Sequence, residues 1–302
     1  MRRVPLHLVA VGFCLFVGAS ASAQVARVFL AGTGNDTSDC SNQATPCRSL
    51  QGAVNQCPSN GEIIILDNGG YGGATIAKSL TVDASAGVVA FIARTIAVTI
   101  ASTDKVVLRG LSMNGIVFGD GSGIDFNGGT LVVENSVIAG FGNGIHQATA
   151  GSNLIVNNCE FRNTDYGVDT ATFSDTNSNT AIENSRFEYN SSAVRSEFGT
   201  VNLSIRNSVL TNNVIGVHAA SASPTRPVLI VVDTCTIVHN SYGMNAYASG
   251  GSPIIRVTNS TIFHNDTGMN LIGASAAIES YGNNRVTANT SGSTFSGTVS
   301  LQ

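Results

Sequence analysis

Residues 133–138, with the sequence VENSVI, open a pattern that returns along the rest of the chain. The later copies are VNNCEF (156–161), IENSRF (182–187), IRNSVL (205–210), VDTCTI (232–237) and VTNSTI (257–262). Every copy begins and ends with an apolar residue, and has asparagine or threonine third and a small residue fourth. The third positions lie 23 to 27 residues apart, and a partial seventh copy starts at Asn283. Self-similarity at such a period indicates a repeat protein.

A glycine or alanine followed by an apolar residue comes after each copy, at 144–145, 167–168, 193–194, 216–217, 243–244 and 268–269. The period is too long for a hexapeptide coil and too short for a propeller blade, and the leucine pattern of a leucine-rich repeat is missing. We therefore predict an all-β fold, a parallel β-helix with three short strands per rung and about 4.8 Å between rungs. Asparagine suits this fold because it tolerates left-handed bends and its stacked amides can hydrogen-bond.

The repeat Asn-Ser-x-apolar-x-x-Asn-x-x-Gly-apolar resembles the right-handed parallel β-helix proteins of the pectate-lyase-like superfamily. The resemblance covers roughly residues 62–292 and implies a right-handed solenoid, as does the general bias of parallel crossovers. That superfamily includes lyases, hydrolases, epimerases and phage spikes, so the resemblance implies an association with carbohydrate but no particular reaction.

The domain organisation follows from composition and periodicity. Arg2 and Arg3, the apolar stretch after them and the Ala-Ser-Ala ending at Ala23 predict a signal peptide at 1–23, too short to span a bilayer. Residues 24–61 are expected to form an N-terminal cap, with a strand at 28–30 and a short helix at 48–57. The parallel β-helix should occupy 62–291, and 292–302 a C-terminal strand or tail. We expect a secreted or periplasmic protein with no membrane span.

The composition bears on the kind of partner, and the cysteine positions bear on disulfide bonding. Only 11% of residues are charged and only two are lysine, which argues against a nucleic-acid partner. Cys40 and Cys47 flank a short polar loop. Because an exported chain reaches an oxidising compartment, we predict a disulfide between them. Cys159 and Cys235 share a repeat position with serines and are expected to be buried free thiols. The sequence leaves open the oligomeric state and any partner of Cys57.

One set of polar residues is a candidate site. The residue after each Gly-apolar pair alternates with a buried position and should face solvent. Stacking should make these residues neighbours on one sheet in the order Asp125, His146, Asp169, Arg195, His218, Asn245 and Asn270, which we call the outer column. Asp125 and Asp169 would lie about 10 Å apart, near the carboxylate separation of inverting glycosidases. The alternative is an ordinary solvated face.

Two family resemblances bear on chemistry. NTDYGVD at 163–169 is similar to the Asn-Thr-Asp-Gly-x-Asp motif of polygalacturonase-type hydrolases, which implies Asp165 as the acid beside Asp169, although Tyr166 is inserted before the glycine. A pectate-lyase-like site would hold Ca²⁺ with clustered acids and use a basic residue, for which Arg195 is the candidate. The aspartates here are dispersed, so we expect no cofactor. His239 and His264 share one repeat position and are expected to be stacked loop histidines rather than a metal site.

Three functional hypotheses remain. The protein could bind a polysaccharide on its outward sheet face. It could instead be a polysaccharide lyase or glycoside hydrolase that uses the outer column from Asp125 to His218. The third hypothesis is a structural or surface-interaction solenoid with no enzymatic activity. The sequence does not decide whether the protein is an enzyme or which glycan it would bind.

Overall fold

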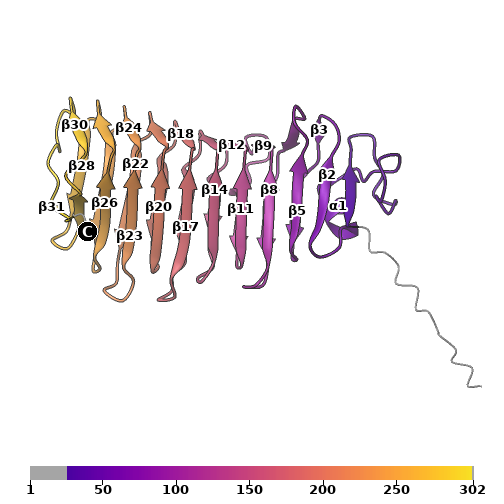
Figure 1. Cartoon of the computed structure of the whole chain (residues 1–302), viewed down its shortest axis with the longest axis horizontal. Coiled ribbons are helices and arrows are strands. Elements are labelled where there is room, and N and C mark those ends of the chain that lie inside the picture. Colours follow the sequence, from indigo (N-terminus) through magenta and orange to yellow (C-terminus); the bar gives the residue numbers. More distant parts are fainter. Residues whose placement is uncertain (1–25, 301–302) are drawn as a thin grey trace, which may run out of the picture.

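A computed structural model describes residues 26–300 of the chain, so the predicted signal peptide at 1–23 lies outside the described residues. These residues form a solenoid in which the strands stack along one long axis, as Figure 1 shows. Three sheets of twelve, ten and nine strands, here called A, B and C, make its sides, and their strands pair in parallel. The predicted all-β parallel β-helix with three short strands per rung is confirmed.

The strand bounds define the rungs. Sheet A contains β1 (Arg27–Leu30), β2 (Gly61–Ile65), β5 (Leu80–Ala84), β8 (Lys105–Arg109), β11 (Thr130–Glu134), β14 (Asn153–Asn157), β17 (Ser178–Glu183), β20 (Val201–Arg206), β23 (Val228–Asp233), β26 (Pro253–Thr258), β29 (Ala277–Ser280) and β31 (Gly297–Thr298). Sheet B contains β3 (Gly69–Gly70), β6 (Ala90–Ile92), β9 (Leu111–Asn114), β12 (Val137–Ala139), β15 (Glu160–Arg162), β18 (Arg186–Glu188), β21 (Val209–Thr211), β24 (Thr236–Val238), β27 (Thr261–Phe263) and β30 (Arg285–Thr287). Sheet C contains β4 (Ala74–Ile76), β7 (Ile96–Thr99), β10 (Ser122–Asn127), β13 (Asn143–Gln147), β16 (Tyr166–Ala171), β19 (Ser192–Glu197), β22 (Ile215–Ser221), β25 (Tyr242–Ala248) and β28 (Thr267–Ile272).

The core is a set of apolar stacks. Inward residues of neighbouring rungs lie in register, as Ile138, Phe161, Phe187 and Leu210 do in sheet B, and all four are fully buried. The rings of Phe161 and Phe187 stack with their centroids 4.8 Å apart. Because each rung buries its apolar residues against the next one, the repeat pattern specifies the core.

Left-handed residues make the two tight corners. Between sheets A and B, the residue with positive φ is an asparagine in most rungs: Asn135, Asn158, Asn184, Asn207, Thr234 and Asn259. At the corner between sheets B and C, which we call the B–C corner, the corresponding residues are Gly140, Asn163, Tyr189, Asn212, His239, His264 and Ala288. Asparagine and glycine adopt this conformation easily, whereas tyrosine and histidine do so rarely.

A buried asparagine ladder lies immediately behind the B–C corner. Its members are Asn190, Asn213, Asn240, Asn265 and Asn289. Each of the first four donates from its side-chain Nδ2 and its backbone N–H to the Oδ1 of the next, at 2.9–3.0 Å. Every Nδ2 also donates to a strand carbonyl, such as that of Phe187 for Asn213. The sequence pattern therefore satisfies polar groups in the core as well as making bends.

Cysteines occur in two settings. Cys159 and Cys235 are buried free thiols, as predicted, and burial raises their pKa values to about 12 and about 11 respectively. Cys57 is also free and buried, and burial raises its pKa to about 11. Cys40 and Cys47 form the predicted disulfide, with 5.2 Å between their Cα atoms. The three free thiols are therefore poor nucleophiles in the folded protein.

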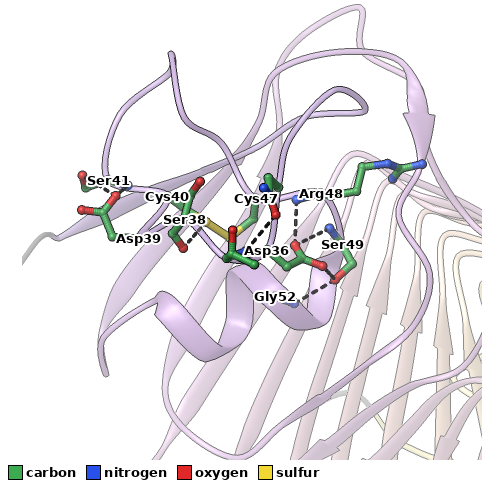
Figure 2. Close-up of a disulfide and its surroundings, with 11 residues drawn as sticks. Asp36, Ser38, Asp39, Cys40, Ser41, Cys47, Arg48, Ser49 and Gly52 are labelled. Carbon is green, nitrogen blue, oxygen red and sulfur yellow. Dashed lines mark hydrogen bonds between the residues drawn. A yellow bond between two sulfur atoms is a disulfide. The ribbon is translucent and has the colours of Figure 1, made fainter.

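The N-terminal end carries helix α1 (Leu50–Gln56), which buries Leu50, Ala53 and Val54. Ser49 caps it by accepting a hydrogen bond from the Gly52 N–H. Figure 2 shows the Asp36 carboxylate behind this cap, where it accepts hydrogen bonds from Ser49 Oγ and from the backbone N–H groups of Arg48 and Ser49. Although burial opposes it, these bonds lower the pKa of Asp36. The strand expected in the cap, β1, is itself part of sheet A and pairs with β2.

Candidate functional site on the outer face of sheet C

The outer column is present in the predicted order. Asp125 pairs in register with His146, His146 with Asp169, and Asp169 with Arg195. The register continues from Arg195 to His218, then to Asn245 and Asn270. Residues 20 or more apart in the chain thus become neighbours on adjacent strands, because three strands and their turns separate successive rungs.

Two members of the outer column, Asn245 and Asp169, are buried rather than solvent-facing, and for these two the prediction was wrong. The Asp169 side chain is only 2% exposed, although it projects from the outer face of the sheet. The Arg195 Nε donates to Asp169 Oδ1 at 2.8 Å, and His146 Nδ1 lies 3.0 Å from Oδ2. The two neighbouring side chains fold over the carboxylate and remain partly exposed themselves. Stacking can therefore bury a charge on an outward position.

Two residues join this cluster that the column alone did not identify. The Arg195 Nη2 lies 2.9 Å from Glu197 Oε1, and the Arg195 guanidinium lies over the Tyr166 ring at 3.7 Å from its centroid. Glu197 follows Arg195 by two positions in β19, so strand alternation places both side chains on the same face. Tyr166 has no such signal, because residues 167 and 168 are both buried and strand alternation fails there.

The charges in the cluster depend on one another. Burial disfavours the charged form of Asp169, but hydrogen bonds from His146 and Arg195 outweigh it and lower the pKa of the carboxyl. The hydrogen bond to Asp169 raises the pKa of His146. Burial raises the pKa of Glu197, and the Asp169 charge adds to this although Arg195 opposes it. Asp169 is therefore the fixed negative centre, and His146 and Glu197 are the groups with adjustable protonation.

His218 behaves differently from His146. Burial, with a further contribution from the positive charge of Arg195, lowers the pKa of His218 to about 4. Its Nδ1 lies 3.1 Å from Asn245 Nδ2, and Asn245 Oδ1 accepts a hydrogen bond from Asn270 Nδ2 at 2.9 Å. An amide nitrogen can only donate, so this geometry requires Nδ1 of a neutral imidazole as the acceptor. The two histidines on either side of the Asp169–Arg195 pair thus have opposite tendencies.

The structure separates the remaining candidates. Asp125 lies beside His146, half-buried, on the side away from Asp169. Asp165 is exposed in the turn before β16 and lines a hollow at the B–C corner with Tyr189 and His239. It is therefore not part of the outer column, and the resemblance of 163–169 to a hydrolase motif does not bring Asp165 into the cluster.

Residues 26–300 contain no group of three or more His, Cys, Asp or Glu side chains placed to hold a metal ion. The rings of His239 and His264 stack with centroids 5.6 Å apart, as expected for loop histidines. No helix within residues 26–300 is long and apolar enough to cross a membrane.

The contact between Asp169 and His146 determines which imidazole nitrogen can accept a proton. Because Asp169 faces Nδ1 of His146, the proton of a neutral imidazole resides there and Nε2 is left as an acceptor. A carboxylate in this position orients the ring and stabilises its protonated form. Both Asp169 oxygens are engaged, so Asp169 and Asp125 do not form the pair of free carboxylates that glycoside hydrolysis requires.

Comparisons with known proteins agree with this architecture. A family model described as "Right handed beta helix region" matches residues 63–228, more than half of the chain. A solved structure titled "Rhamnogalacturonan lyase" superposes with a TM-score of 0.50 at 12% identity, covering 87% of this chain and 84% of that one. At that identity the likeness concerns the fold alone. A search of curated proteins found no match. The chain belongs to the right-handed β-helix family.

Proposed function

We propose that this is an exported β-helix protein that binds a polysaccharide on the outer face of sheet C and processes it through the outer column. The centre of the proposed site is Asp169 with His146 and Arg195 on either side. Export is supported by the signal-peptide pattern ending at Ala23 and by the Cys40–Cys47 disulfide, a bond that persists in oxidising compartments.

One observation carries this proposal. Asp169 is an almost fully buried carboxylate on the outside of a sheet, held charged by an arginine and a histidine from neighbouring rungs. A solenoid needs only small or polar residues at such positions, and a buried ion pair contributes little net stability. Titratable groups with perturbed pKa values that gather at one place are typical of functional sites.

The geometry favours proton abstraction over hydrolysis. His146 Nε2 is the available proton acceptor, oriented by Asp169 through Nδ1. In a lyase-type elimination, His146 would take the proton next to a sugar carboxyl while the glycosidic C–O bond on the adjacent carbon breaks. Glu197, which pairs with Arg195 and whose pKa is raised by burial, is the group to which we assign the return of a proton to the leaving oxygen.

The test is a panel of neutral and acidic polysaccharides incubated with purified protein beginning at Gln24. Affinity electrophoresis measures binding, absorbance of unsaturated ends reports elimination, and reducing ends report hydrolysis. His146→Gln should abolish product formation and Ser204→Ala, on the outer face of sheet A, should leave it unchanged. No binding and no product on any polysaccharide would contradict the proposal. N-terminal sequencing of protein secreted by a host tests export, with Gln24 expected first.

A further inference from the structure

We propose a second saccharide site at the B–C corner, a groove that takes a neutral, hydroxyl-rich glycan segment. This inference rests on the proposed polysaccharide function and adds to it a separate binding site for neutral segments of the polysaccharide, apart from the outer column where a sugar carboxyl would be processed. The groove is lined by residues of the turns between sheets B and C and by the adjoining ends of sheet B strands, not by the outer column. Tyr189 is its central residue, with a side chain that is 60% exposed.

Two surface hollows meet at Tyr189. One, of about 600 Å³, is lined on the corner by Asn163, Asp165, Asn212 and His239 among others. The other, of about 500 Å³, lies toward sheet B and includes Ile116. Tyr189 and Asn163 line both hollows, so the two adjoin at the tyrosine. Volumes of this size suit a small ligand, and an aromatic ring with a few convergent polar groups is typical of such sites.

An enlarged turn closes the groove on the side of the earlier rungs. Gly123 follows Met113 by ten positions, whereas in the next rung Gly144 follows Ile138, the partner of Met113, by six. The additional residues put Ile116, which is 76% exposed, beside the hollow. The groove therefore has a wall that no regular rung would provide.

Tyr189 occupies a position that the fold would fill more easily with another residue. Its φ is 56°, and the same position in the rungs before and after it is Asn163 and Asn212, with φ of 52° and 55°. Asparagine tolerates this left-handed conformation, but a bulky ring does not. The exposed ring buries little surface in return, so folding does not account for it. Strained residues of this kind gather at ligand sites.

The amides on either side of Tyr189 are available to a ligand. At the corner between sheets A and B, exposed asparagines pair with one another, as Asn158 does with Asn135 at 2.8 Å and Asn207 with Asn184 at 2.6 Å. Asn163 and Asn212 are two rungs apart with Tyr189 between them, about 10 Å along the axis. Within residues 26–300 their side chains make no hydrogen bond. Each can therefore donate to and accept from sugar hydroxyls.

Charge selects the class of glycan. Asp165 is an exposed carboxylate in the groove with no ion-pair partner among the described residues. The nearby Arg162 is paired with Glu160 at 2.9 Å. A polyanionic chain would meet an uncompensated negative charge, whereas hydroxyl groups of a neutral sugar can donate to it. The apolar face of a pyranose can lie on the Tyr189 ring, which is apolar on its faces and polar at its tip.

The test compares Tyr189→Asn with His264→Asn, using galactan, mannan and β-glucan as neutral probes and polygalacturonate as the acidic one. Both substitutions relieve the same left-handed strain at the same turn position, but His264 lies outside the groove. Tyr189→Asn should weaken binding of a neutral probe at least tenfold without lowering the thermal midpoint, and His264→Asn should leave binding unchanged.

Unchanged binding by Tyr189→Asn would overturn the groove, as would a loss confined to polygalacturonate. His146→Gln separates this outcome from failure of the proposed function. If His146→Gln eliminates product formation while Tyr189→Asn binds normally, only the groove is wrong. If Tyr189→Asn loses binding and His146→Gln changes nothing, only the outer column is wrong. Wild-type protein that binds none of the probes contradicts both.

Discussion

Two stacks of polar side chains run along this solenoid and have opposite characters. The buried ladder repeats one residue, from Asn190 to Asn289, and each of its first four amides is satisfied by the next. The outer column changes residue at nearly every rung and places a carboxylate between an imidazole and a guanidinium. Both use the same rung spacing. Repetition of one residue therefore marks a structural stack, and variation marks a place where stacking brings different chemistry together.

The difference has an energetic basis. An asparagine ladder is self-complementary, because each amide both donates and accepts. A column with Asp169 in it is stable only when the neighbouring rungs supply His146 and Arg195, so the residues must be matched in order. Substitutions should thus break the ladder through unsatisfied amides and the outer column through unpaired charge.

The largest effect is expected from Asn213→Ala in the ladder. The substitution leaves the backbone N–H of Asn190 and one of its two Nδ2 hydrogens without an acceptor, and removes the donor to the Phe187 carbonyl. Buried polar groups without partners cost about 1 to 3 kcal/mol each, so we expect a loss of about 4 kcal/mol. Urea unfolding followed by circular dichroism measures it. Asn212→Gly, the exposed neighbour, is the control, and equal losses for the two would contradict a buried structural ladder.

The next largest loss of stability is expected from Asp169→Ala. If the carboxylate were an exposed surface charge, its removal would leave stability nearly unchanged. Because it is buried and paired, its removal leaves Arg195 partly buried beside Glu197 alone, and we expect a loss of about 3 kcal/mol. A double-mutant cycle with Arg195→Ala, read by urea unfolding, should show strong coupling. Additive losses would indicate that the ion pair contributes nothing.

The fold could be predicted from the sequence because the same pattern of residues specifies every rung. Apolar positions, bend asparagines and the Gly-apolar pairs recur at one period, and even the order of the outer column follows from their alignment. The burial of Asp169 could not be predicted in this way, because that burial depends on how the Arg195 and His146 side chains of adjacent rungs fold over the carboxylate. Tyr166 was missed because residues 167 and 168 are both buried, which breaks the two-residue alternation.

The motif at 163–169 is the reverse case, in which the sequence suggested a site residue that the structure does not bring into the cluster. Its asparagine and glycine are positions that the repeat itself supplies, so the likeness to a hydrolase motif carried little independent information about Asp165. The structure puts that aspartate at the B–C corner, where it belongs to a different surface. Local similarity within a repeat is therefore weak evidence of catalysis.

The two histidines of the outer column should give opposite pH dependences. His218 has a folded pKa of about 4, so the unfolded chain, with a pKa near 6.5, binds its proton first as the pH falls. Its contribution is present above about 6.5 and is lost as the pH falls toward 4. The raised pKa of His146 gives a contribution that is present below about 6.5 and is lost as the pH rises through the folded value.

NMR titration should find His146 protonating above the ordinary histidine range and His218 near pH 4. Because solvent reaches the edge of the column, we expect the His218 contribution to be about 1 kcal/mol. His218→Gln should flatten the stability profile between pH 6.5 and 4. Two histidines that titrate together near 6.5 would show that the Asp169–Arg195 pair does not differentiate them.

The smallest effect is expected from Asn184→Gly at the corner between sheets A and B. Asn184 donates to Asn157 and accepts from Asn207, at 2.8 and 2.6 Å, so on paper it resembles a member of the buried ladder. Its side chain is exposed, however, and water can replace both bonds. Its φ of 52° also suits glycine, which offsets part of the loss. We expect a change within about 0.5 kcal/mol by urea unfolding, against the much larger loss for Asn213→Ala. A loss of comparable size would mean that stacking of amides, rather than their burial, stabilises the solenoid.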